Sequence, residues 1–255
     1  MPAPKILILR APGTNCDRET DFAFSCAGGV TECVHVNALL ENPRQLIDYQ
    51  ILCIPGGFSY GDDISAGRIL ACQIRHHLAD TISEFRDAGK LVLGICNGFQ
   101  VLIKSGVLVT DCAATLTWND KGRFEDRWVR TAVDGERCVF LRGIESMYLP
   151  IAHAEGKFVA RDGDTLGELD QAGQLALRYA DENSQYSTSL DFPNNPNGSQ
   201  ANVAGMCDET GRVLGMMPHP ERHLDPTHHP QWTRMDSHEQ GDGLRLFENA
   251  IRYFD

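Results

Sequence analysis

The feature that most restricts the fold of this chain is an apolar segment that ends in a glycine-flanked cysteine. Residues 91–95 read Leu-Val-Leu-Gly-Ile, and Cys96-Asn97-Gly98-Phe99-Gln100 follows directly. A short apolar run of this kind is typical of a strand buried on both faces of a parallel sheet. Glycines at 94 and 98 permit tight backbone geometry and the close approach of a substrate. The sequence therefore predicts a buried strand, a sharp turn at Cys96 and then a helix.

Strand-like and helix-like segments alternate through the first half of the chain. We predict strands at residues 5–9, 31–36 and 51–54, and a helix at residues 17–27 that ends at Gly28-Gly29. Apolar residues at steps of three or four predict one further helix that ends at Gly89: Leu70, Ile74, Leu78, Ile82 and Phe85. This alternation indicates an α/β fold in which helices cover both faces of a mostly parallel sheet.

The second half of the chain is less regular. Short alternating segments at residues 127–133, 175–179 and 203–206 predict antiparallel or mixed strands, and a final helix places apolar residues from 244 to 254 on one face. Two long polar segments, residues 181–197 and 223–240, lack periodicity, and we expect them to be surface excursions. No linker divides the chain, so we predict a single domain over residues 1–255.

Cys96 is the candidate nucleophile. The N-terminus of the following helix offers unpaired N–H groups and a positive dipole end, which favour the thiolate. The competing interpretation is a buried, inert thiol, since free cysteine is commonly a core residue. Cys16, which also lies between a strand and a helix, is the rival nucleophile.

A base for this thiol is predicted far downstream, at Met217-Pro218-His219-Pro220-Glu221. The prolines favour extended backbone, so His219 and Glu221 should leave the strand on the same side. A carboxylate beside an imidazole fixes its tautomer and stabilises its charged form. Cys96, His219 and Glu221 thus form a plausible acyl-transfer triad, although His219 could instead be a loop histidine and Glu221 a surface charge.

Paired glycines follow the strand predicted at residues 51–54. Gly56-Gly57 would let backbone N–H groups face a ligand without side-chain obstruction. We predict that the N–H groups of Gly57 and Asn97 form an oxyanion hole. The glycines could in principle hold a phosphate, but no lysine accompanies them. The chain has neither a G-x-x-x-x-G-K-[ST] nor a G-x-G-x-x-G sequence, so ATP binding by this chain is not expected.

These segments resemble class I, or triad, glutamine amidotransferases, and most closely the glutaminase subunits of phosphoribosylformylglycinamidine synthase. The resemblance covers nearly the whole chain and is carried by Pro12-Gly13-Thr14-Asn15-Cys16-Asp17, Gly56-Gly57-Phe58-Ser59-Tyr60-Gly61-Asp62, Cys96-Asn97-Gly98-Phe99-Gln100, Pro150-Ile151-Ala152-His153-Ala154-Glu155-Gly156, Asn195-Pro196-Asn197-Gly198-Ser199 and residues 215–222. It implies a flavodoxin-like three-layer sandwich with a mostly parallel central sheet and additional antiparallel or mixed strands in the second half.

The resemblance also implies an activity, partners and further site residues. The subunit would hydrolyse glutamine and deliver ammonia for formylglycinamidine ribonucleotide synthesis in purine biosynthesis. Its partners would be a large synthetase subunit, which binds ATP and Mg, and a small bridging subunit. Substrate contacts are expected at Gly56, Phe58 and Gln100, and a secondary site or partner face at His153 and Glu155. The chain itself would hold no cofactor.

Composition excludes several other classes. The net charge of −12 argues against nucleic acid and anionic membranes as partners, because both favour Lys/Arg clusters. The nine cysteines include no C-x-x-C pair, and the N-terminus lacks the pattern of a signal peptide, so we expect a cytoplasmic protein with reduced thiols. Five histidines fall between residues 219 and 238, but prolines interrupt the segment and we predict no metal site.

Three alternatives remain open at the level of the sequence. A glutamine amidotransferase of another pathway would share the triad. A stand-alone cysteine hydrolase of similar fold would act without a partner. A non-catalytic scaffold subunit would not hydrolyse glutamine at all, even with the synthetase present.

Overall fold

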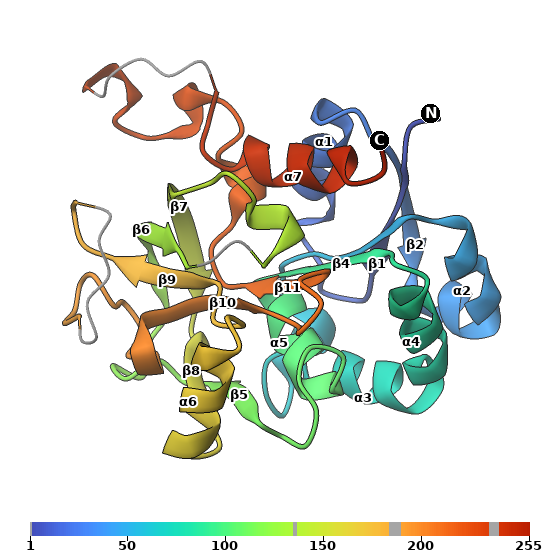
Figure 1. Cartoon of the computed structure of the whole chain (residues 1–255), viewed down its shortest axis with the longest axis horizontal. Coiled ribbons are helices and arrows are strands. Elements are labelled where there is room, and N and C mark those ends of the chain that lie inside the picture. The colour runs from blue at the N-terminus through green and yellow to red at the C-terminus, as the bar shows by residue number, and fades with distance from the viewer. Residues whose placement is uncertain (1, 135–136, 184–189, 235–239) are drawn as a thin grey trace.

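The computed structural model describes residues 2–134, 137–183, 190–234 and 240–255, and its centre is one mixed sheet of nine strands (Figure 1). The strand order is β2-β1-β3-β4-β11-β10-β9-β6-β7, and a separate pair of strands, β5-β8, lies beside it. The predicted α/β class, with helices on both sides of the sheet, is confirmed.

One half of the sheet is parallel. It contains β1 (Lys5–Arg10), β2 (Val30–His35), β3 (Ile51–Ile54), β4 (Leu91–Ile95) and β11 (Val213–Met216), and every pairing among them is parallel. All residues of β3, β4 and β11 are buried, as expected for strands covered on both faces. Since β4 and β11 are neighbours, their carboxyl ends reach the same edge of the sheet.

The other half is antiparallel, as the alternating segments predicted. It contains β6 (Glu125–Val133), β7 (Ser146–His153), β9 (Leu177–Ala180) and β10 (Val203–Cys207), and β10 joins it to β11. The accessory pair consists of β5 (Ala114–Thr117) and β8 (Lys157–Ala160), also antiparallel.

Helices cover the two faces of the sheet. On one side, α1 (Asp17–Cys26) packs against α7 (Leu244–Arg252), with the Phe24 and Phe247 rings edge to face at 4.9 Å. On the other side lie α3 (Arg68–His77) and α5 (Asn97–Ser105) (Figure 1). The remaining helices are α2 (Val36–Glu41), α4 (Ala79–Asp87) and α6 (Gly163–Gln171). None of the helices within the described residues combines the length and apolarity needed to cross a membrane.

The single helix predicted from Leu70 to Phe85 is wrong in one respect, because the structure breaks it into α3 and α4. Leu78 separates the two with φ −124° and ψ 1°, far from helical values. The apolar side chains of the stripe are nevertheless all buried. The break changes the direction of the chain while the side chains stay in the core, so periodicity alone could not reveal it.

The two polar segments are only partly surface excursions, which corrects the sequence prediction. Asn195 and Asn197 are buried, and the Asn195 side chain accepts hydrogen bonds from the N–H groups of Gly198 and Ser199. His223 and His229 are buried too, and their rings pack edge-on against the Trp128 ring. These buried side chains hydrogen-bond to the backbone, His223 Nδ1 to the Tyr148 carbonyl and His229 Nδ1 to the Gln231 N–H. Residues 184–189 and 235–239 of these segments lie outside the described residues.

Candidate active site

Cys96 occupies the sharp turn between β4 and α5. Its φ of 51° and ψ of −103° lie outside the regions that L-residues favour, and such strain is typical of a nucleophile held on a strand-to-helix turn. Its N–H donates to the Met216 carbonyl of β11 at 2.7 Å. The turn is therefore fixed directly to the strand that leads to His219.

Gly98 explains why this turn sits so close to the sheet. A Cβ at residue 98 would lie 1.8 Å from the Ile54 carbonyl oxygen, which is impossible without moving the backbone. Gly98 was predicted to allow the approach of a substrate, but the group that comes close is the backbone of β3, on whose end the first turn of α5 rests.

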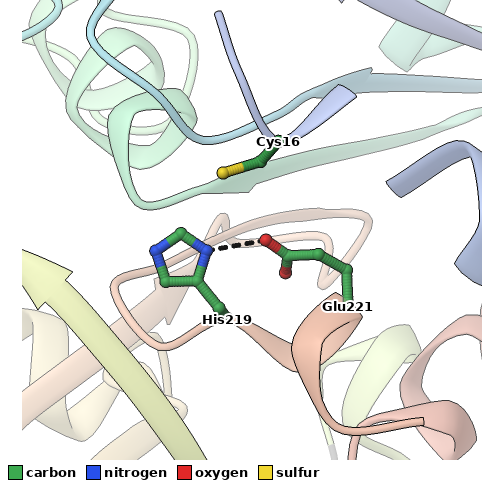
Figure 2. A group of neighbouring side chains, drawn as sticks. All are labelled: Cys16, His219 and Glu221. Carbon is green, nitrogen blue, oxygen red and sulfur yellow. Dashed lines mark hydrogen bonds and ion pairs between the residues drawn. The ribbon is translucent and has the colours of Figure 1, made fainter. Parts of the chain in front are cut away.

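His219 and Glu221 follow β11 and lie beside Cys16 (Figure 2). His219 Nδ1 is 2.6 Å from Glu221 Oε1, and both side chains are almost completely buried. Burial disfavours the imidazolium, but the negative charge of Glu221 and the neighbouring Cys96 outweigh it and raise the pKa of His219 well above its usual range. Within the part of the chain that the structure describes, His219 Nε2 has no partner at hydrogen-bond geometry, and the nearby Cys16 and Cys96 thiols contribute to its raised pKa.

Of the two predicted oxyanion donors, Gly57 lines the same cavity as Cys96 and Asn97 follows Cys96 in the chain. Gly57 has φ +140°, and a Cβ there would come within 2.9 Å of backbone atoms of Gly13, Thr14 and Asn15, so only glycine fits. Asn97 is the first residue of α5, where backbone N–H groups lack intrahelical partners.

Side chains around this turn form one hydrogen-bond network. Asn97 Nδ2 donates to Asp62 Oδ1 and Gln100 Oε1, each at 2.9 Å, and Asn97 Oδ1 accepts from the Ser59 N–H. Gln100 Nε2 donates to the Glu155 carbonyl at 2.6 Å. Gln100 therefore braces the turn, and its amide is already engaged. Asp62 belongs to a motif that carries the resemblance. Its contact with Asn97, 35 residues away in the sequence, is formed only by the folded chain.

A cavity of about 250 Å³ opens above Cys96. Its walls include Gly57, Phe58 and Gln100 from the predicted site, and also His153 and Glu155. The structure thus brings the predicted secondary pair next to the thiol. Trp118 and Asp62 also line the cavity, and sequence reasoning did not assign either to the site.

His153 and Glu155 serve different parts of the cavity wall. Burial, together with His219, lowers the pKa of His153 to about 3, so its imidazole is neutral, and Nδ1 lies 3.2 Å from Asn119 Oδ1. The Glu155 carboxylate accepts from the Ala66 N–H and pairs with Lys104 at 3.5 Å. Asn119 and Lys104 had no distinguishing sequence signal, apart from Lys104 lying one helical turn beyond Gln100.

Gly56 and Cys16 lie next to the His219 ring. A Cβ at Gly56 would come 2.9 Å from His219 Cε1 and 3.0 Å from Cys16 Sγ, so Gly56 provides room for both side chains. Arg222 Nη2 donates to Cys16 Sγ at 3.1 Å and its Nε donates to Glu19. Burial raises the pKa of the Cys16 thiol.

Ligand atoms of Cys16, His219 and Glu221 lie within 4.8 Å of one another, which is a possible metal-binding arrangement. In this structure, however, Glu221 engages His219 Nδ1 and Arg222 engages Cys16. The hydrogen bonds of these three side chains therefore fit a histidine that is held by the Glu221 carboxylate, with Cys16 packed next to the ring.

The Lys104–Glu155 pair is expected to contribute strongly to stability. Both side chains are at most 10% exposed, so Lys104→Met would leave a buried carboxylate without its cation. We expect a loss of about 3–5 kcal/mol in the free energy of unfolding. Urea titration followed by circular dichroism measures it. The double variant Lys104→Met/Glu155→Gln should recover part of the loss, and a single-variant loss below 1 kcal/mol would contradict a role for the pair.

Comparison with known proteins identifies the class first. The family model described as a CobB/CobQ-like glutamine amidotransferase domain matches residues 3–254, almost the full chain. A solved glutamine amidotransferase structure from Thermotoga maritima shares the fold, with a TM-score of 0.54, 15% identity and coverage of 99% of this chain and 92% of that one. The chain thus belongs to the class of glutamine amidotransferase domains.

Relatives of higher sequence identity show which family within this class the chain belongs to. The phosphoribosylformylglycinamidine synthase subunit PurQ of Dehalococcoides mccartyi is 44% identical over 254 residues, which cover 98% of this chain and 97% of the relative. PurQ of Methanococcus maripaludis is 39% identical over 267 residues, with coverage of 98% and 97%. The structure of PurLQS from Thermotoga maritima matches with a TM-score of 0.75 at 30% identity, covering 99% of this chain and 100% of that one. The chain belongs to the PurQ family of phosphoribosylformylglycinamidine synthase subunits, as its motifs predicted.

Proposed function

We propose that this chain is the glutaminase subunit of a phosphoribosylformylglycinamidine synthase. It hydrolyses glutamine to glutamate and ammonia and delivers the ammonia to a synthetase subunit that makes formylglycinamidine ribonucleotide in purine biosynthesis. The observation that carries the proposal is the buried His219–Glu221 pair beside a strained Cys96, in a chain 44% identical to a PurQ subunit.

The reaction passes through a thioester. Cys96 loses its proton to His219, and the thiolate attacks the side-chain carbonyl carbon of glutamine; Gly57 and Asn97 N–H groups stabilise the resulting oxyanion. His219 returns the proton to the amide nitrogen as the C–N bond breaks and ammonia leaves. Water, deprotonated by His219, then hydrolyses the thioester and restores the thiol. Glu221 holds the imidazole tautomer throughout.

The cavity residues have supporting roles in this mechanism. Phe58 walls the glutamine, and Gln100 maintains the turn that aims the Asn97 N–H. Gly56 contributes space for His219, and His153 and Glu155 form another part of the cavity wall. We infer that residues 1–255 act as one class I glutamine amidotransferase domain, in the cytoplasm, without a cofactor of their own.

The partners follow from the chemistry and from the relatives. Ammonia released into water at neutral pH becomes ammonium, which is not a nucleophile, so the site must face its acceptor. In line with the PurLQS complex, we assign a large synthetase subunit, PurL, which carries ATP and Mg, and a small bridging subunit, PurS. Large apolar side chains are exposed at and near the cavity, as a docking face requires: Phe58, Ile64, Trp118 and Phe124.

Reconstitution tests this function. Glutamate and ammonia release should be slow for the chain alone and rise at least about tenfold when its PurL and PurS subunits, ATP and formylglycinamide ribonucleotide are added. The control is the same mixture without this chain. Absence of glutamine hydrolysis in the full mixture would favour the scaffold interpretation. A rate of hydrolysis that is the same with and without the partner subunits would favour a stand-alone hydrolase.

A further inference from the structure

A second cavity lies apart from Cys96 and is lined by residues of α3, the end of α5 and the β5–β8 pair. Figure 1 shows these elements in its lower part. Its volume is about 700 Å³, within the range of small-molecule sites. None of the triad residues lines it. The proposed glutaminase mechanism therefore leaves it without a role.

Positive charge is concentrated on this cavity. Its lining contains four cationic residues, Arg68, Arg75, Lys104 and Arg161, and one carboxylate, Asp111. The whole chain has the opposite balance, with 35 acidic and 23 basic residues. This local excess of cations would attract an anion.

Two of these arginines are not neutralised by a carboxylate within the described residues. Arg68 is exposed and forms no ion pair there. Arg75 donates only to backbone, to the carbonyls of Lys104 at 2.5 Å and Ser105 at 3.3 Å. Arg161, by contrast, pairs with Asp162. Arg68 and Arg75 are thus the guanidinium groups with capacity for a bidentate phosphate contact.

The rest of the lining is largely apolar. Ile103, Val109, Ala114, Val159 and Ala160 contribute aliphatic surface, and Thr110 and Thr115 contribute hydroxyl groups. A cavity with cations at one part and aliphatic surface at another matches a molecule that has a phosphoryl group and an organic body. Inorganic phosphate alone would leave most of the volume unfilled.

Lys104 connects this cavity with the glutaminase site. It lines the cavity, yet its ammonium donates to Ser65 Oγ at 2.7 Å and to the Ala66 carbonyl at 2.6 Å, and it pairs with Glu155. Ala66 and Glu155 in turn line the pocket above Cys96. An anion near Lys104 would compete with Glu155 for the ammonium and loosen that wall.

We propose that this cavity binds a phosphorylated metabolite of nucleotide size through Arg68 and Arg75, and that the bound anion weakens glutamine binding through Lys104. The binding step stands on the cavity alone. The effect on glutamine rests on the proposed glutaminase function.

Calorimetric titration with AMP as a probe of the required size tests the binding step. Saturable binding is expected for the wild type, with at least about tenfold weaker binding for Arg68→Ala, since a charge-assisted hydrogen bond contributes more than 1.4 kcal/mol. Arg142→Ala, an exposed arginine in the chain segment beside α7, is the matched control and should bind like the wild type. Adenosine, which lacks the phosphoryl group, should not bind.

The outcomes separate the two parts of the proposal. No binding of AMP, or equal affinity in wild type and Arg68→Ala, overturns the site. If AMP binds as expected, it should raise the KM for glutamine in the wild type and not in Arg68→Ala; an unchanged KM overturns the coupling alone. If no variant hydrolyses glutamine, the proposed function fails, while the calorimetric result still decides the binding site.

Discussion

Replacing Cys96 by alanine is expected to reduce glutamine hydrolysis by about 10⁴-fold or more, to the level of residual catalysis by binding and the oxyanion donors. Cys96 is the thiol on the strained turn that lines the cavity, beside a histidine already paired with a carboxylate. Without it no thioester forms. Glutamate release by the reconstituted complex measures the loss, and thermal unfolding of the variant checks that the fold is kept.

Cys16→Ala is the matched control for this substitution. Cys16 is also next to His219, but it lies behind the imidazole against Gly56 and Arg222, and it is absent from the cavity lining. We expect it to retain at least about one tenth of the activity, because the substitution removes packing against the ring and the contact with Arg222 but leaves Cys96, His219 and Glu221 in place. If Cys16→Ala abolished hydrolysis and Cys96→Ala did not, the assignment of the nucleophile would be reversed.

Gly98→Ala is expected to have the largest effect on stability, a loss of more than about 4 kcal/mol or failure to fold. The added methyl group would lie 1.8 Å from the Ile54 carbonyl oxygen and 2.7 Å from its carbon. Both belong to backbone in the buried strand β3, so no side-chain rotation relieves the overlap. Denaturant titration, or the yield of folded protein, measures the effect.

Gly167→Ala provides the control for the glycine substitution. Gly167 lies within α6, and a Cβ there meets no atom within 4 Å. Alanine should therefore stabilise the protein by about 0.5–1 kcal/mol through its higher helix propensity. A Gly98→Ala protein as stable as the Gly167→Ala protein would show that α5 does not need this close approach to β3.

The sequence patterns predicted those strands and helices whose apolar residues follow a regular spacing. The apolar runs of β3 and β4 and the stripe around Ile74 identified their elements because burial imposes those periodicities. The break at Leu78 and the burial of Asn197 and His229 did not follow from local pattern. The burial of Asn197 and His229 depends on partners distant in sequence, the Tyr179 hydroxyl for Asn197 and the Trp128 ring for His229.

In the candidate site, too, some features followed from the local sequence and others only from tertiary contacts. Glycines around Cys96 and prolines around His219 indicated a nucleophile and a base, because each constrains its own backbone. Their proximity required the pairing of β4 with β11, which the sequence could only suggest through the family resemblance. Lys104, Asn119 and Trp118 carried no pattern of their own and became site residues only through tertiary contacts.

The central position of β11 has a consequence for the order of synthesis. This strand is inserted between β4 and β10 although it is the last strand in the chain, and it leads into His219. A nascent chain in which Cys96 has already been synthesised therefore lacks His219, the base in the proposed mechanism, until β11 and the residues after it have been added. Translation products that end before β11 would lack His219, the base in the proposed mechanism, so the strand order makes the proposed activity depend on a late step of synthesis.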